Sequence, residues 1–86
     1  MIYEKLKKET IKGKVVEILY ENQEWISKEG EIDYPSLLKE YNKRHGYQIY
    51  SDTITRSARE IRTALKGEGN FQEALQRVYK SVFAST

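Results

Sequence analysis

The chain has 86 residues, of which 38% are hydrophobic and 33% are charged; this is the composition of one folded domain spanning 1–86, not of a disordered tail. It contains no cysteine and a single histidine, which excludes disulfides, thiolate metal sites and histidine-rich metal sites. The net charge is +2, and no apolar run is long enough for a signal peptide or a membrane span, so we expect an intracellular, cytoplasmic protein.

The first predicted helix covers about residues 10–23, with a start near residue 3 as the alternative. Thr10 is a candidate N-cap, and the apolar residues that follow have the spacing of one helix face. Gly13 weakens a continuous helix that would begin further back. The apolar positions of this face are Ile11, Val15, Ile18 and Leu19.

The second helix is predicted to begin at Asp33-Tyr34-Pro35, because aspartate caps helices and proline is tolerated in the first turn. Before it, residues 22–30 are polar except for Trp25 and Ile26, which we expect to tuck under the helices as a very short strand. Gly46, after His45, predicts a left-handed glycine stop. The expected buried face is Leu37, Leu38 and Tyr41.

The third helix, Ser51 to Lys66, has the clearest pattern in the chain. Ser51 is the predicted N-cap, and Gly67 and Gly69 are predicted to end the helix. The small residue at its centre, Ala58, permits close approach to another helix. Its apolar positions follow at i, i+4, i+7 and i+11, namely Ile54, Ala58, Ile61 and Leu65.

A fourth helix is predicted over about residues 70–83. A β-hairpin is the alternative, but no Gly, Pro, Asn or Asp follows Phe71 to form its turn. The apolar face of this helix either closes the core of the monomer, which we favour, or forms the two-fold interface of a homodimer. Its apolar residues are Phe71, Leu75, Val78, Tyr79, Val82 and Phe83.

The exposed face of the third helix carries the pattern that indicates a function. Arginine can donate two hydrogen bonds to guanine, threonine can bond bases or touch the thymine methyl, and helix amides can meet a phosphate. A merely solvated, charged face is the alternative, but a preceding helix and a serine start favour a helix-turn-helix. The predicted DNA-binding residues are Ser51, Thr53, Thr55, Arg56, Arg59, Arg62, Thr63 and Lys66.

The segment from Ser51 to Arg62, SDTITRSAREIR, resembles the recognition helix of winged-helix and related helix-turn-helix domains. The resemblance covers residues 10–66 and implies a three-helix core with the third helix in the major groove. It also implies base or phosphate contacts from Thr53, Thr55, Arg56 and Arg59. The link between Gly46 and Ser51 is longer than the tight turn, which favours the winged-helix type. The wing itself is expected to be reduced or absent, with the fourth helix in its place.

Other charged and aromatic groups have competing interpretations. The five lysines of residues 5–14 form either a basic arm along the phosphates of DNA or a solubilising tail. His45 is expected to be a cation that complements the end of its helix, and the tyrosines are expected to pack with exposed hydroxyls rather than to contact nucleic acid. A triplet of glutamates is interpreted as a solvated face and not as a metal site. These groups are Lys5, Lys7, Lys8, Lys12 and Lys14; Tyr41, Tyr47 and Tyr50; and Glu17, Glu21 and Glu24.

The distribution of charge completes the functional hypothesis. Residues 15–34 carry six acids and one lysine, whereas four of the five arginines lie within residues 44–62. We expect the acidic block, residues 17–33, to face away from DNA. The predicted function is binding of double-stranded DNA by a small, nucleoid-associated regulator of transcription or replication, of phage or plasmid type. The alternative is a protein-interaction module that uses the acidic block or the C-terminal helix. No catalysis, cofactor, metal, membrane partner or small-molecule substrate is predicted.

Overall fold

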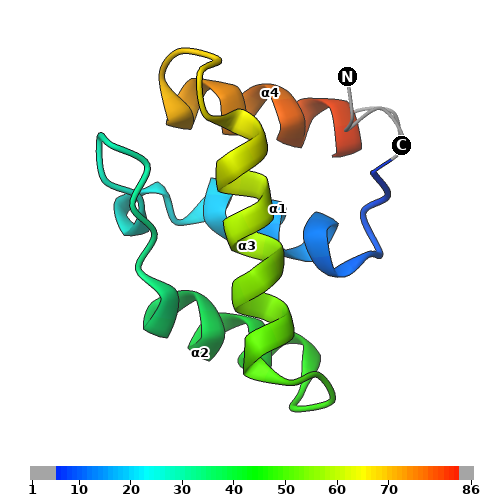
Figure 1. The fold of residues 1–86 in the computed structure, drawn as a ribbon. Helices are drawn as coiled ribbons and strands as arrows, with labels where there is room; N and C mark the ends of the chain where they lie inside the picture. Colours follow the sequence, from blue (N-terminus) through cyan, green and yellow to red (C-terminus); the bar gives the residue numbers. More distant parts are fainter. Residues whose placement is uncertain (1–5, 84–86) are drawn as a thin grey trace.

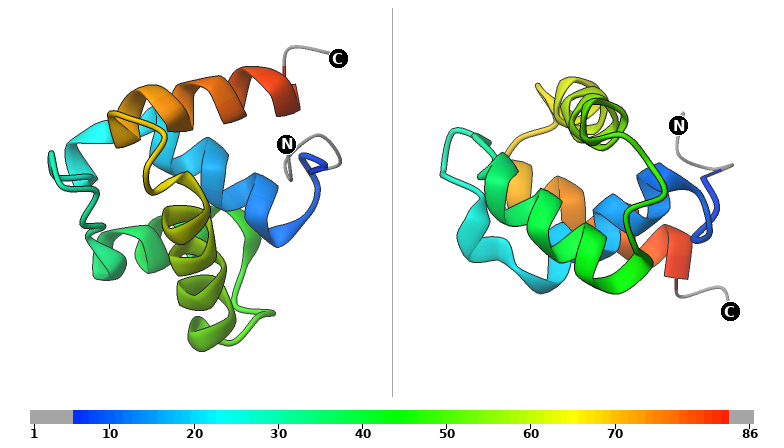
Figure 2. Two further views of the ribbon diagram at one scale, coloured as in Figure 1. Left: turned by 45° about the horizontal axis from the view of Figure 1, so that its top comes forward. Right: turned by 90° about the horizontal axis from the view of Figure 1, so that it is seen from below.

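The computed structural model describes residues 6–83, and over that range the fold is all-α, as the sequence predicted. It contains α1 (Ile11–Glu21), the short 3-10 helix η2 (Gln23–Trp25), α2 (Tyr34–His45), α3 (Ser51–Leu65) and α4 (Phe71–Phe83). α3 crosses α1, and α2 and α4 lie near opposite ends of α3 (Figure 1). Seen nearly end-on in the right panel of Figure 2, α3 packs against the other helices with one side only.

The start of α1 confirms the predicted cap and explains Gly13. Thr10 is the N-cap, and its hydroxyl accepts a hydrogen bond from the Gly13 amide at 3.0 Å. The hydroxyl also donates to the Lys7 carbonyl at 2.7 Å, which folds the preceding segment back over the first turn. A Cβ on Gly13 would overlap that carbonyl and would lie 2.9 Å from Lys8 Cα. Glycine at this position therefore permits a close backbone contact, whereas the sequence analysis read it only as a weak point of the helix.

The C-terminal end of α1 differs from the sequence prediction. The helix ends at Glu21, and residues 23–25 form the 3-10 turn η2, so Trp25 is not part of a strand. Ile26 does pair with Ile32, but in one isolated antiparallel bridge. The alternative start near residue 3 falls on residues 1–5, outside the described range. Residues 6–10 precede the helix and are not helical.

α2 begins and ends where the local signals predicted. The Asp33 carboxylate accepts hydrogen bonds from the Ser36 amide at 3.3 Å and the Ser36 hydroxyl at 2.8 Å, with Pro35 in the first turn. Gly46 ends the helix with φ 80° and ψ 172°. This φ is positive, as expected, but the ψ is extended and lies outside the left-handed helical region. Glycine allows this sharp exit from α2 because it has no Cβ.

α1 forms the centre of the core. Val15, Val16, Ile18 and Leu19 are completely buried, and the other three α-helices each contribute an apolar stripe around them. Burial of a single aliphatic side chain of this kind contributes about 1.5–3 kcal/mol. The stripe of α3 is Ile54, Ala58, Ile61 and Leu65, as predicted, and α2 contributes Leu37 and Tyr41.

α4 confirms the helical prediction over the hairpin. Its apolar residues face the core, with Leu75 and Val78 fully buried, so α4 closes the core of the monomer. Asn70 caps it by accepting the Glu73 amide at 3.1 Å. Tyr79 stacks on Tyr20 of α1 with ring centroids 3.9 Å apart and planes 7° apart. Within residues 6–83 no β-hairpin follows α3, which agrees with the predicted absence of a wing.

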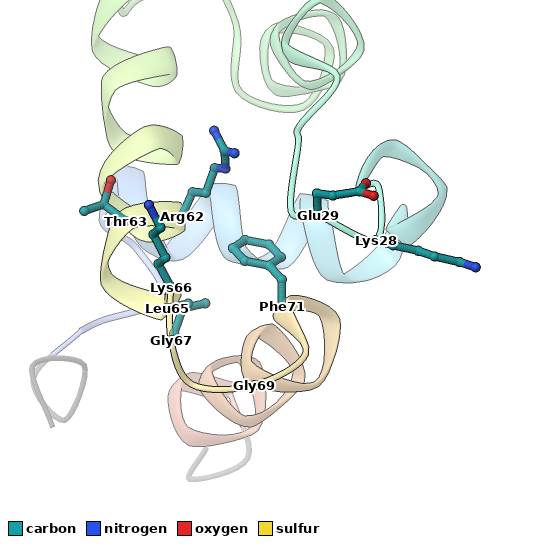
Figure 3. A pocket seen from close by; sticks show the side chains of 9 residues that line it. All are labelled: Lys28, Glu29, Arg62, Thr63, Leu65, Lys66, Gly67, Gly69 and Phe71. Carbon is teal, nitrogen blue, oxygen red and sulfur yellow. The ribbon is translucent and has the colours of Figure 1, made fainter.

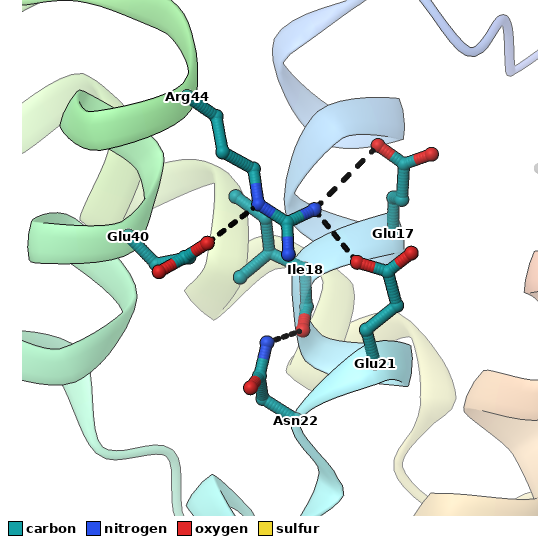
Figure 4. A network of polar contacts seen from close by, with 6 residues as sticks. All are labelled: Glu17, Ile18, Glu21, Asn22, Glu40 and Arg44. Atoms are coloured by element: carbon teal, nitrogen blue, oxygen red, sulfur yellow. Dashed lines mark hydrogen bonds and ion pairs between the residues drawn. The ribbon is translucent and has the colours of Figure 1, made fainter.

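Arg44 connects the C-terminal end of α2 to α1 (Figure 4). Its guanidinium lies 2.7 Å from Glu40, 2.7 Å from Glu21 and 3.9 Å from Glu17. This arginine therefore offsets part of the negative charge of the acidic block and links α2 to α1. Because the Arg44 hydrogen bond stabilises the ionised carboxylate, the pKa of Glu40 is lowered.

No helix within residues 6–83 is long and apolar enough to cross a membrane.

Candidate nucleic-acid interface

α3 presents its polar face to solvent as the sequence predicted. The buried residues of the helix form one stripe that ends at Leu65, and the residues half a turn away from that stripe are exposed. Thr53, Thr55 and Arg62 lie on the flanks and are half-buried. Lys66 follows directly after the last helical residue. The fully exposed predicted residues are Ser51, Arg56, Arg59, Thr63 and Lys66.

The beginning of α3 differs from the prediction, because Tyr50 and not Ser51 occupies the N-cap position. Tyr50 is extended, with φ −62° and ψ 142°, and no side chain caps the helix. Ser51 is the first helical residue, and the Tyr50 carbonyl accepts the amides of Thr53 and Ile54 at 3.0 and 3.4 Å. The start of α3 therefore lacks the side-chain acceptor that Thr10 and Asp33 provide at α1 and α2. Asp52 complements the helix dipole in its place.

Two tyrosines of the link between α2 and α3 are the residues that sequence reasoning missed. Tyr47 and Tyr50 are each 87% exposed, so the expected packing role is wrong for both. Tyr41 is fully buried and does pack in the core. Ile49 is partly buried against the core and fixes the link between the two exposed rings. The exposure of these two rings cannot be predicted from periodicity, since a five-residue link has neither a helical nor a strand repeat.

The four arginines of residues 44–62 have different surroundings. Arg56 is exposed and forms no hydrogen bond or ion pair with any residue of the described range. The Arg59 guanidinium lies 6.0 Å from the ring centroid of Tyr34, at the outer limit of a cation–π contact. Arg62 donates to Glu31 at 2.7 Å, and Arg44 is bound by the carboxylates of Figure 4. Arg56 and Arg59 are therefore the arginines of this group that are most open to a binding partner.

A shallow depression of about 310 Å³ lies on the same side of α3. Arg56, Arg59 and Thr63 line it together with Glu60 and Ala64. Lys12 of α1 lies 3.7 Å from Glu60 and offsets the negative charge of this carboxylate. The exposed middle of α3 is therefore a hollowed, arginine-bearing strip.

The acidic block is not uniformly turned away from α3. Glu17 and Glu21 are held between α1 and α2 by Arg44, so the interpretation of the glutamate triplet as a solvated face needs this amendment. Glu31 reaches the C-terminal half of α3 through Arg62, and Glu29 lines a cavity there (Figure 3). Glu29 and Glu31 therefore lie beside the C-terminal half of α3. Glu31 offsets part of the positive charge at the C-terminal half of α3, whereas Arg56 and Arg59 form no ion pair within residues 6–83.

The N-terminal lysines and His45 also have defined surroundings. Lys5 lies outside the described residues, whereas Lys7 and Lys8 are exposed. The ring of His45 packs against Tyr41 in a tilted arrangement, with ring centroids 4.9 Å apart and planes at 57°. Burial and the nearby Lys14 lower the pKa of His45, although Glu17 opposes them. The structure therefore favours a neutral imidazole rather than the predicted cation at the end of α2.

The described part of the chain contains no group of three or more His, Asp or Glu side chains that could hold a metal ion. No protein-family model, curated protein or solved structure matches this chain. Its function is therefore inferred from the chemistry of the surface around α3.

Proposed function

We propose that the protein binds double-stranded DNA by inserting the exposed face of α3, around Arg56 and Arg59, into the major groove. The observation that carries the proposal is the pair Arg56 and Arg59, which are exposed, one turn apart and opposite the buried stripe of α3. An α-helix such as α3 is about 10–12 Å across with its side chains and fits the major groove, which is about 12 Å wide. The remaining contacts follow from what surrounds these two arginines.

Arg56 and Arg59 are the residues assigned to base edges, where a guanidinium can bond O6 and N7 of guanine together. Thr55 lies on the flank nearest Arg59, within reach of the same groove wall. Ser51 and the first amides of α3 are placed to meet a phosphate, because the positive end of the helix dipole favours an anion there. Contacts to phosphates position the protein on the DNA and carry no sequence information.

Tyr47 and Tyr50 extend this surface beyond α3. Both rings are exposed directly before the first turn of the helix, and their hydroxyls can donate to phosphate oxygens. Lys43, exposed in the last turn of α2, adds a positive charge near the link. We assign these three residues to the DNA backbone on either side of the inserted helix.

The helix-turn-helix order of α2 and α3 supports the same proposal. The two helices are joined by residues 46–50, and both pack on α1. The resemblance to winged-helix domains implies a three-helix core, and this order of helices is compatible with it. Within residues 6–83 α4 follows α3 where such a domain would have its wing, so we assign no minor-groove contact to a hairpin.

A titration of fluorescent mixed-sequence duplex DNA, followed by anisotropy at about 50 and about 200 mM salt, tests the proposal. Each phosphate neutralised by a lysine or arginine contributes about −0.9 to the slope of log K against log salt. Lys43 alone therefore predicts a slope of about −1, and Arg56 and Arg59 bring it to about −3 if they also bind phosphates. A protein-interaction module would show no binding at the lower salt concentration. That outcome would refute DNA binding and would direct attention to Tyr47 and Tyr50 as a protein-binding surface, since aromatic residues and arginines are also enriched there.

A further inference from the structure

A cavity of about 250 Å³ lies at the C-terminal end of α3 (Figure 3). It is enclosed by the last turn of α3, the loop to α4 and the turn at residues 28–29. Gly67 and Gly69 form one edge and place no side chain over the opening. The cavity is separate from Arg56 and Arg59, and of the exposed α3 strip it shares only Thr63.

Two core residues, Leu65 and Phe71, form the apolar part of a cavity lining that is otherwise mostly polar. Leu65 is 1% exposed and Phe71 is 7% exposed, so both are anchored in the core. The Phe71 ring is covered by Gly30, where a Cβ would lie only 3.3 Å from the ring. Since this ring forms a wall between α3 and the turn at residues 28–29 (Figure 3), a flat apolar group can lie against it.

The charged groups around the cavity are predominantly positive. Arg62 lies in the last turn of α3 and Lys66 directly follows the helix, and their side chains extend on the same side of the cavity (Figure 3). Arg62 is oriented by Glu31 through one terminal nitrogen at 2.7 Å, which leaves the other guanidinium hydrogens free to donate. The charged ends of Lys28 and Glu29 point away from Phe71 in the same view. The cavity therefore combines two cations with an aromatic wall.

We propose that this cavity binds a small aromatic anion, with its ring against Phe71 and its carboxylate or phosphate between Arg62 and Lys66. The cavity is open to solvent, and its volume of about 250 Å³ exceeds the roughly 150 Å³ in which a closed apolar cavity accommodates benzene, so one ring and a charged substituent can be placed there. Such a ligand is bound and not chemically changed. The inference does not depend on DNA binding, because neither Arg56 nor Arg59 lines the cavity.

The test is a titration of the ¹⁵N-labelled protein, without DNA, followed by amide chemical shifts. The probes are benzoate and phenyl phosphate, with inorganic phosphate as the charge without a ring and benzyl alcohol as the ring without a charge. We expect the two aromatic anions to shift the amides of Gly30, Gly67 and Gly69 with a Kd of about 1 mM. Gly46 lies in the link before α3 and serves as the internal control.

Lys66→Met should weaken the binding of both aromatic anions by about three- to fivefold, which is the upper range for one exposed charge pair. Lys80→Met, on the exposed face of α4, removes the same charge and should leave their Kd unchanged. The inference is refuted if neither anion shifts the three glycines, or if inorganic phosphate binds as tightly as phenyl phosphate. A failure of this experiment leaves DNA binding untouched, and a failure of the DNA titration leaves this site untouched.

Discussion

At the scale of single residues, Gly13 shows how tertiary contact overrides intrinsic helix propensity. Alanine is preferred to glycine within a helix by about 1 kcal/mol, so propensity alone would predict that Gly13→Ala stabilises α1. The Cβ would instead press on the backbone of Lys7 and Lys8, which the Thr10 hydrogen bonds hold against the helix.

We therefore expect Gly13→Ala to lower the free energy of unfolding by about 1–3 kcal/mol, the usual cost of overpacking. Urea denaturation followed by circular dichroism measures the change. Ser81→Ala, at an exposed position of α4, is the control and should alter the free energy by no more than about 0.5 kcal/mol. A Gly13→Ala variant as stable as the native protein would show that the segment before α1 moves aside without cost.

Burial of the Tyr41 hydroxyl is expected to lower the stability of the protein. Its hydroxyl is buried without a hydrogen-bond partner in the described structure, while the ring fills the core between α1 and α2. Tyr41→Phe keeps the ring and removes the desolvated hydroxyl, so we expect the free energy of unfolding to rise by up to about 1 kcal/mol. Thermal denaturation measures this change, with Tyr47→Phe as an exposed control that should be neutral. A lower Tm for Tyr41→Phe would mean that the hydroxyl has a stabilising partner.

His45 makes stability depend on pH in a defined window. Its pKa is lowered from 6.5 in the folded protein, so the unfolded chain binds the proton first as the pH falls. The stabilisation is complete above the unfolded value and is lost as the pH falls through the folded value. The denaturant midpoint of the native protein should therefore be lower at about pH 5.5 than at about pH 7.5. In His45→Phe this decrease should disappear, and an unchanged decrease would assign it to other groups.

At the scale of elements, the sequence predicts helices best where the signal is local. Thr10 and Asp33 were identified as caps because a cap and the first apolar turn are close in sequence, and α4 was identified by its period. Ser51 was misassigned as a cap because the extended conformation of Tyr50 depends on how the link packs through Ile49. The outward direction of Tyr47 and the ion pair between Arg62 and Glu31 depend on contacts between distant segments, which periodicity does not encode.

The contact between α1 and α2 depends on Arg44. Arg44→Met would leave Glu17, Glu21 and Glu40 close together without a cation, and we expect it to lower the free energy of unfolding by about 1 kcal/mol. Arg62→Met removes a single, more exposed ion pair and should cost less. Urea denaturation at about pH 7 compares the two variants.

The same network predicts a pH dependence for the Arg44 variant. The pKa of Glu40 is lowered by Arg44, so its contribution is present above 4.5 and is lost as the pH falls through the folded value. The native protein and Arg44→Met should therefore approach equal stability at about pH 3. A difference that persists at this pH would assign the effect to packing of the arginine side chain rather than to its charge.

At the scale of the whole molecule, the fold places two different surfaces on one helix. α1 occupies the centre, so α3 is supported along its inner side while its outer side stays free (Figure 2). The exposed arginines of this outer side were predictable from the helical period of α3. The cavity at its C-terminal end was not, because it is assembled from α3, the turn at residues 28–29 and the start of α4.

The measurement that tests the central claim most directly compares two charge-matched double variants in the duplex titration. Arg56→Ala/Arg59→Ala should lose about 1–3 kcal/mol of binding free energy for each arginine that reads a base, or lower the salt slope by about 1 for each that binds a phosphate. Arg77→Ala/Lys80→Ala removes the same charge from the exposed face of α4 and should bind DNA as the native protein does. Equal loss of affinity in both variants would mean that DNA binding depends only on the net charge of the protein. Unchanged affinity in the Arg56/Arg59 variant would exclude α3 as the DNA-binding helix.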